Sequence, residues 1–216
     1  MSAAAPHEDL DAPEGFSEAV GATPERLAAI ESFRLMLEAA NARTNLVGAS
    51  TLPDFWRRHY LDSAQLAWFA PEARVWADLG SGAGLPGLVL AMLMKGRPGA
   101  RVHLVESVAK RCDFLKQVAA TLDLPVTVHN ARAESLALEV EVVTARACAP
   151  LTRLLGFAEP SMARGARGLF LKGQEAAAEI AEARKAWRFE SHCQASLSDP
   201  RGQVLLVTEL ARAARR

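Results

Sequence analysis

The chain has 216 residues, of which 50% are hydrophobic, and this is enough to bury one α/β core with a small appendage. Its formal net charge is zero, so overall charge does not indicate a nucleic-acid substrate and any basic surface must be local. The three cysteines are far apart without a CxxC pair and the five histidines lack metal-ligand spacing, which argues against a zinc ribbon, a disulfide framework or any other metal site.

The first part of the chain is predicted to form a tail and a helical extension. Residues 1–22 are expected to be a mobile tail. They carry acids and lack the basic-then-apolar start of a targeting signal. A helix begins at a Thr23 cap and is broken at Asn45. A second helix is expected over Thr51–Phe69, so the helical extension covers residues 23–70.

From residue 71 onward, strand and helix patterns alternate. Strands are predicted at Arg74–Leu79, Arg101–Glu106, Val126–His129, Val140–Thr144, Gly168–Leu171, Arg188–Gln194 and Gln203–Thr208, and helices at Leu85–Lys95, Val108–Leu122, Leu151–Met162 (interrupted near Pro160) and Glu175–Trp187. Repeated strand–helix units imply one α/β domain over residues 71–216, with a mainly parallel, doubly wound sheet. The last two strands are joined by a short turn region and should pair antiparallel, because a parallel crossover needs about a dozen residues or more.

The most informative segment is a glycine-rich turn after the first of these strands. Residues 78–87 read Asp-Leu-Gly-Ser-Gly-Ala-Gly-Leu-Pro-Gly, and apolar runs flank them on both sides. Glycines let the backbone turn sharply and approach a ligand closely, and Pro86 suits the first turn of a helix. The helix that follows points free N–H groups at whatever the turn holds. The segment therefore indicates a site for a nucleotide-type cofactor.

Two cofactors fit this turn. The GxGxxG spacing that starts at Gly82 matches the dinucleotide fingerprint, with Glu106 near the ~20-residue offset expected of a ribose-binding acid. The DxGxGxG spacing that starts at Asp78 is instead the pattern of S-adenosylmethionine methyltransferases, in which the strand-end acid helps to hold the methionine ammonium group. A parallel sheet that ends in an antiparallel hairpin favours the methyltransferase. A glycine turn that binds nothing is the remaining alternative.

Further motifs between residues 41 and 175 make the chain similar to one family. The matching stretches are Asn45–Leu46, Arg58–Ser63, Asp78–Gly87, Glu106–Leu115, Arg132–Glu134, Thr144–Ala147 and Leu171–Gly173. On these stretches the chain resembles the bacterial 16S ribosomal RNA guanine-N7 methyltransferases, also called the glucose-inhibited division protein B family. The glycine turn alone indicates only a methyltransferase, whereas the sets around His59, Lys110, Arg146 and Lys172 make the match specific.

The resemblance implies a Rossmann-like methyltransferase fold with an N-terminal helical extension. It also implies transfer of a methyl group from S-adenosyl-L-methionine to N7 of a guanine in the 530 loop of 16S rRNA, so the partner would be this RNA or the small ribosomal subunit. The cofactor-binding positions, taken from the glycine pattern and from the family, are Asp78, Gly80, Gly82, Gly84, Leu85, Glu106, Ala133, Glu134 and Arg146. Glu106 would accept hydrogen bonds from the ribose hydroxyls.

The implied chemistry needs no general base. Guanine N7 has an exposed lone pair, so no proton leaves before it attacks the methyl group, and catalysis can be mostly alignment. The family match makes Arg146, His59 and Asp62 candidates for positioning the reacting groups, although His59 and Asp62 can also simply pair on one helix. RNA is expected to meet a local basic rim, because phosphate contacts supply much of the affinity. The candidates for this rim are Arg57, Arg58, Lys110, Arg111, Arg146 and Lys172.

Other functions share part of this pattern. A methyltransferase for another RNA or a small molecule would have the same cofactor site, and a nicotinamide oxidoreductase would bind NADH instead. A binding module with a vestigial turn would bind RNA without turnover. The longest apolar run is far shorter than the ~20 residues that span a bilayer, so we expect a cytoplasmic protein without a membrane partner. We take the protein to be a monomer.

Overall fold

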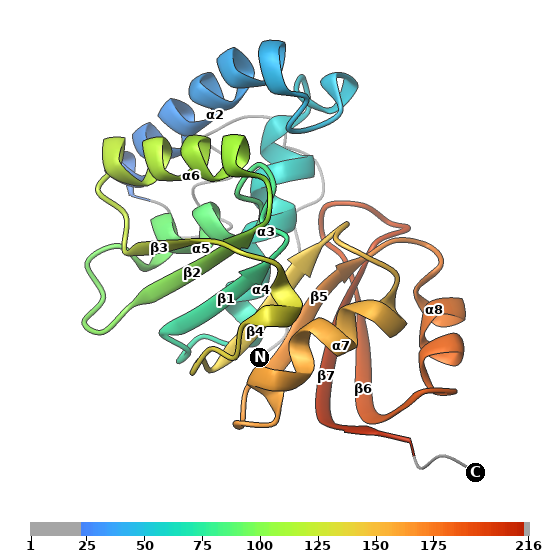
Figure 1. The fold of residues 1–216 in the computed structure, drawn as a ribbon. Helices are drawn as coiled ribbons and strands as arrows, with labels where there is room; N and C mark the ends of the chain where they lie inside the picture. Colours follow the sequence, from blue (N-terminus) through green and yellow to red (C-terminus); the bar gives the residue numbers. More distant parts are fainter. Residues whose placement is uncertain (1–22, 214–216) are drawn as a thin grey trace.

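The computed structural model describes residues 23–213, so the predicted tail lies outside the described residues. One seven-stranded sheet has the order β3-β2-β1-β4-β5-β7-β6 (Figure 1). Its strands are β1 (Val75–Leu79), β2 (Arg101–Glu106), β3 (Val126–Asn130), β4 (Val142–Arg146), β5 (Arg167–Lys172), β6 (Trp187–Ala195) and β7 (Gln203–Arg212). Because β1 lies between β2 and β4, the winding of the sheet reverses beside β1, which is where open α/β sheets bind ligands.

The strand pairing confirms the predicted sheet. Strands β1 to β5 pair in parallel, whereas β7 is antiparallel to both β5 and β6. The first residue of β7, Gln203, lies opposite Lys172 at the carboxyl end of β5. The loop of residues 196–202, which joins β6 to β7, therefore lies at the same edge of the sheet as the carboxyl ends of the parallel strands.

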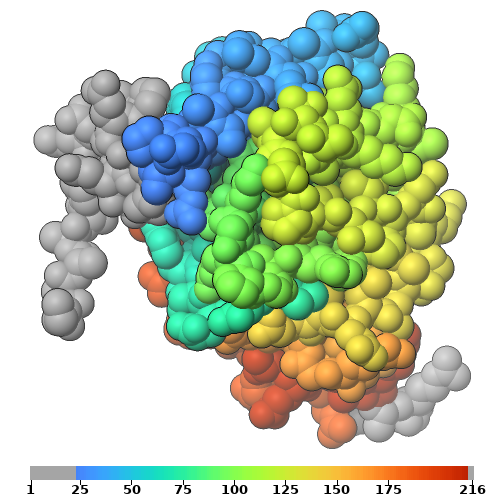
Figure 2. Space-filling view, turned by 90° about the vertical axis from the view of Figure 1, so that its left-hand side faces the viewer, coloured from blue at the N-terminus to red at the C-terminus, as the bar shows by residue number. Residues whose placement is uncertain are grey.

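Helices cover both faces of the sheet. They are α2 (Pro24–Thr44), α5 (Gly87–Met94) and α6 (Ala109–Thr121) on one face, and α7 (Leu151–Met162) and α8 (Ala176–Ala183) on the other (Figure 1). Figure 2 shows α2 (blue) and α6 (yellow-green) side by side at the surface. One hydrophobic cluster joins Ile30, Phe33 and Leu37 of α2 to Trp76 of β1 and Leu104 of β2. The N-terminal helical extension thus shares its core with the sheet. Among residues 23–213, no helix is long and apolar enough to cross a membrane.

The prediction of one continuous helix over Thr51–Phe69 is wrong. The segment is divided into a 3-10 helix η1 (Ala49–Thr51), a π-helix η2 (Trp56–Leu61) and two short helices, α3 (Asp62–Ala64) and α4 (Leu66–Phe69). The chain departs from helical geometry at residues 52–54 and again at Gln65. Inside the π-helix, the carbonyl of Arg58 also accepts from the Arg146 side chain and the carbonyl of His59 from the Ser63 hydroxyl. π-helical segments are frequent at functional sites.

The other predicted elements are confirmed, with boundaries moved by a few residues. Helix α2 begins after Thr23, whose hydroxyl accepts a backbone N–H three residues on, and it ends at Asn45, which has a φ of 42°. Helix α7 continues through Pro160, where an interruption was expected. Trp187, expected at the end of a helix, instead opens β6, and its indole N–H donates to the Thr152 carbonyl. Strand β4 lies two residues later than expected and so includes Arg146.

Candidate functional site

Two buried carboxylates hold the glycine turn in place. Asp78 lies near the end of β1, and its Oδ2 accepts from the Gly87 N–H at 3.0 Å, where α5 begins. Glu106 ends β2, and its two oxygens accept from the Gly82 N–H at 3.0 Å and the Val108 N–H at 2.8 Å. Free N–H groups at the start of a helix favour a carboxylate. The turn is therefore anchored to both of the strands beside it.

The backbone of the turn requires its glycines. Gly80, Gly82 and Gly84 have φ values of 68°, 53° and 86°, a conformation that other residues rarely adopt. A Cβ at Gly80 would lie 2.5 Å from Cys148 Sγ, and one at Gly84 would lie 2.2 Å from a methyl group of Leu88. A Cβ at Gly82 would meet only the Gly80 carbonyl oxygen, at 3.8 Å. The backbone at Gly82 therefore borders open space that a ligand can fill.

The corner at Asp78 contains buried oxygens that need partners. Asp78 is 0% exposed, and its Oδ1 has no hydrogen-bond partner among the described residues. Burial raises the pKa of Asp78 to about 7, although the Gly87 N–H acts in the opposite direction. Thr144 lies opposite Asp78 in the parallel register, and its buried hydroxyl also has no partner in the described part of the chain. Since an unsatisfied buried polar group is unfavourable, this corner fits a ligand with an ammonium group.

Arg146, at the end of β4, meets both other predicted positioning residues. Its guanidinium donates to His59 Nδ1 at 3.2 Å and to Asp62 Oδ2 at 3.3 Å. Because arginine has no acceptor, Nδ1 must accept, and Nε2 carries the proton that is donated to Thr51 Oγ1 at 2.9 Å. Burial, followed by the charges of Arg146 and Arg58, lowers the pKa of His59 to about 3. The imidazole is therefore neutral, and in this structure its lone pair is already engaged by Arg146.

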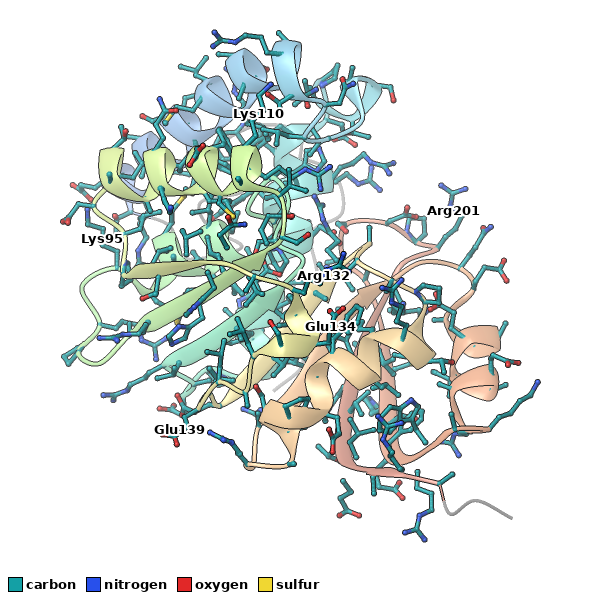
Figure 3. The ribbon with its side chains drawn as sticks, in the orientation of Figure 1. Lys95, Lys110, Arg132, Glu134, Glu139 and Arg201 are labelled. Carbon is teal, nitrogen blue, oxygen red and sulfur yellow. The ribbon has the colours of Figure 1, made fainter. Side chains whose placement is uncertain are left out.

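The residues predicted to form the basic rim differ in how exposed their side chains are. Arg58 and Lys110 are exposed, and Figure 3 shows Lys110 at the start of α6. Arg57 is half-buried, and its Nε donates to the Ser198 carbonyl at 2.9 Å. Arg111 is half-buried beside the carboxylate that ends β2, at 3.8 Å. Arg58 and Lys110 are therefore the members of this set that are best placed to meet a large polyanion.

The side chain of Lys172 is buried and forms an ion pair inside the protein. Its side chain is only 8% exposed, and its Nζ lies 2.7 Å from Glu179 Oε2. The same Glu179 oxygen accepts from the Leu151 N–H at 2.6 Å, where α7 begins. This arrangement fixes the loop between β4 and α7, which carries Cys148 against the glycine turn. Neither Glu179 nor Cys148 was predicted to support the site, because Glu179 reaches the start of α7 across 28 residues and neither residue belongs to a motif.

The remaining predicted cofactor residues lie in short connecting segments. Leu85 is buried at the end of the glycine turn, with 3% exposure. Ala133 and Glu134 form the 3-10 helix η3 (Ala133–Ser135) after β3. Figure 3 shows Glu134 beside Arg132, with the charged atoms 3.8 Å apart. Between residues 23 and 213, no group of three or more His, Cys, Asp or Glu side chains is placed to hold a metal ion.

Three features together place this chain in the class of S-adenosylmethionine-dependent methyltransferases. They are a glycine turn at the winding reversal, two buried acids at strand ends and an antiparallel β7. Solved structures share the fold. A mutant of MtNAS in complex with S-adenosylmethionine has a TM-score of 0.53 and 17% identity, covering 94% of this chain and 86% of that chain. A fibrillarin/Nop5p complex has a TM-score of 0.50 and 9% identity, covering 70% of this chain and 84% of that chain.

Sequence comparison identifies the particular family. The family model for rRNA small subunit methyltransferase G matches residues 26–204. The ribosomal RNA small subunit methyltransferase G of Caulobacter vibrioides (strain NA1000) is 59% identical over 210 residues, 97% of each chain. That of Parvibaculum lavamentivorans is 46% identical over 201 residues, 91% of this chain and 89% of the relative. The chain belongs to the rRNA small subunit methyltransferase G family, and its cofactor is S-adenosylmethionine rather than a dinucleotide.

Alanine at Gly80 and alanine at Gly82 are expected to have different effects. Both positions have positive φ, so both variants carry similar backbone strain, but only at Gly80 would the new Cβ lie 2.5 Å from Cys148 Sγ. We expect Gly80→Ala to lower the free energy of unfolding by about 1–3 kcal/mol more than Gly82→Ala does, as in overpacked cores. Denaturant unfolding measures the difference. Adding Cys148→Ala should recover part of the loss, whereas equal stabilities of the two single variants would contradict this contact.

Proposed function

We propose that this protein transfers the methyl group of S-adenosylmethionine to N7 of a guanine in the 530 loop of 16S rRNA, in the cytoplasm. The observation that carries the choice of N7 is the neutral His59, whose lone pair is occupied by Arg146. A site in which His59 has no lone pair left to take a proton suits an acceptor atom that already presents a lone pair. The relatives' shared name, ribosomal RNA small subunit methyltransferase G, supports the small-subunit RNA as the substrate.

The cofactor would be held between the two buried acids. The free Oδ1 of Asp78 would accept from the ammonium group, directly or through water. Each oxygen of Glu106 receives one N–H, and each has a second lone pair that can accept from a ribose hydroxyl. The open space at Gly82 lets the ligand approach the backbone between them, and Ala133 and Glu134 would lie at the adenine. S-adenosylmethionine supplies a methyl group made electrophilic by a positively charged sulfur.

The chain's own contribution is alignment. Arg146 is held by His59 and Asp62, and it is the charged group available near the end of β4 to orient the purine. Arginine often reads O6 and N7 of guanine together, but here N7 must stay free to react. Arg146 would therefore contact O6, a phosphate or the cofactor. Exposed Arg58 and Lys110 would hold the RNA backbone, and this binding should weaken as salt rises.

Affinity for S-adenosylhomocysteine should rise with pH through about 7. Burial raises the pKa of Asp78 to about 7, so at lower pH the carboxyl is protonated and does not attract an ammonium group. Calorimetry between about pH 5.5 and pH 8.5 measures this dependence. In Asp78→Asn the affinity should be lower and nearly independent of pH over this range. An unchanged affinity in this variant would contradict the assignment of Asp78.

Replacing His59 with glutamine should leave a substantial rate of methyl transfer. The glutamine amide can accept from Arg146 and donate to Thr51, as the neutral imidazole does. The measurement is the single-turnover rate at saturating RNA and cofactor. A general base contributes ~10²–10⁴-fold. A loss of that size, with unchanged affinities and a wild-type rate that rises through a histidine pKa, would show that proton removal limits the reaction and that N7 is the wrong atom.

The substrate is tested by mass mapping of ribosomal RNA from cells with and without the gene. We expect one guanine of the 530 loop to lose a single methyl group in the deletion strain, and purified protein should restore it in the presence of S-adenosylmethionine. The contribution of the basic rim is tested separately. The variants Arg58→Glu and Lys110→Glu should each reduce RNA affinity without changing cofactor affinity. Unchanged 16S rRNA in the deletion strain, with methylation appearing on another RNA or a metabolite, would overturn the proposed substrate.

A further inference from the structure

The Asp62 carboxylate connects Arg146 to a distant loop. Its Oδ2 accepts from Arg146 at 3.3 Å, and its Oδ1 accepts from the Ser198 hydroxyl at 2.7 Å. Ser198 lies 136 residues further along the chain, in the loop of residues 196–202 between β6 and β7. It is only 4% exposed. Figure 3 shows Arg201, also in this loop, at the surface. The loop thus reaches the Arg146 cluster through one buried hydroxyl.

Gln65 fixes the backbone around Ser198. Its side chain is 0% exposed, and its Nε2 donates to Ser196 Oγ at 2.9 Å while its Oε1 accepts from the Leu197 N–H at 3.0 Å. Ser196 Oγ also accepts from the Ser198 N–H at 3.2 Å. The amide of Gln65 lies within 3.3 Å of Asp62 Oδ1 as well. These bonds leave the loop little freedom beside Asp62.

The direction of each hydrogen bond follows from the donor chemistry. A carboxylate only accepts and a guanidinium only donates, so the Ser198 hydroxyl must donate to Asp62 and Arg146 must donate to both Asp62 and His59. Ser196 Oγ already accepts from two N–H donors, so its own proton is the one available for Ser198 Oγ, 2.9 Å away. The resulting chain of hydrogen bonds runs from Ser196 through Ser198 and Asp62 to Arg146 and on to His59.

We propose that Ser198 is a positioning residue for methyl transfer, acting through Asp62 on the Arg146 guanidinium. This inference rests on the proposed function, in which Arg146 orients the reacting groups. The contact between Arg146 and Asp62 is a single one of 3.3 Å, so its direction depends on how the carboxylate is rotated. The 2.7 Å bond from Ser198 sets that rotation, and the buried Gln65 holds Ser198 in register. Small displacements of aligned groups lower reaction rates strongly.

The test compares variants of Ser198 in single-turnover methyl transfer. The substrates are S-adenosylmethionine and small ribosomal subunits from a strain that lacks the gene, both saturating. We expect Ser198→Ala to lower the rate about tenfold, the size of one lost hydrogen bond, with S-adenosylhomocysteine affinity and RNA affinity within about twofold of wild type. Ser198→Thr keeps the hydroxyl and should retain most of the rate. Ser191→Ala in β6, which removes a hydroxyl bonded to Arg184, serves as the matched control.

Two further comparisons separate positioning from folding. Threonine and valine have the same shape and differ by the hydroxyl. Comparing the rates of Ser198→Thr and Ser198→Val therefore tests the hydroxyl even if Ser198→Ala does not fold. In an Asp62→Asn background, Ser198→Ala should cause no further loss, because both act through one carboxylate. A wild-type rate in Ser198→Ala, or equal rates in the Thr and Val variants, would overturn the proposal. Failure of wild-type protein to methylate the subunit RNA would overturn the proposed function instead.

Discussion

The structure depends on two buried carboxylates that close the glycine turn from opposite sides. Asp78 binds the N–H of Gly87 and Glu106 binds the N–H of Gly82, so β1, β2 and the start of α5 are joined through one short loop. Three glycines of the turn have positive φ values, and a side chain at Gly80, Gly84 or Gly87 would lie too close to its neighbours. The turn lies at the winding reversal of the sheet, and its backbone already has a shape that can receive a ligand.

One of these acids, Asp78, makes folding less favourable when it is ionised. Burial raises the pKa of Asp78 in the folded protein to about 7, above the value of 3.8 for an exposed aspartate. An acid with a raised folded pKa opposes folding when it is ionised, so its contribution to the free energy of unfolding falls as pH rises from about 4 to 7. In the proposed complex, an ammonium group bound at Asp78 would offset this loss, and cofactor binding and folding stability would be linked through this side chain.

The sequence was most informative where the chemistry is local. The glycine spacing, the strand-end acids Asp78 and Glu106, and the alternation of strands and helices all lie within short windows, and the structure has the predicted elements there. The sequence failed where distant side chains decide the outcome. Arg146 donates to the Arg58 carbonyl across 88 residues, and Glu179 accepts from the Leu151 N–H across 28. The role inferred for Ser198 was also invisible, because its partner is 136 residues away. These contacts are tertiary hydrogen bonds that no local pattern encodes.

The two acids that hold the turn are proposed also to bind the cofactor, Asp78 at its ammonium group and Glu106 at its ribose. A crystal structure of the complex with S-adenosylhomocysteine tests this proposal most directly. The amino group should lie within hydrogen-bond distance of Asp78 Oδ1, directly or through one water, and the ribose hydroxyls should contact Glu106. The bonds from Gly87 and Gly82 to these acids should persist. A ligand bound away from the turn, or one that breaks both bonds to bind, would contradict the account.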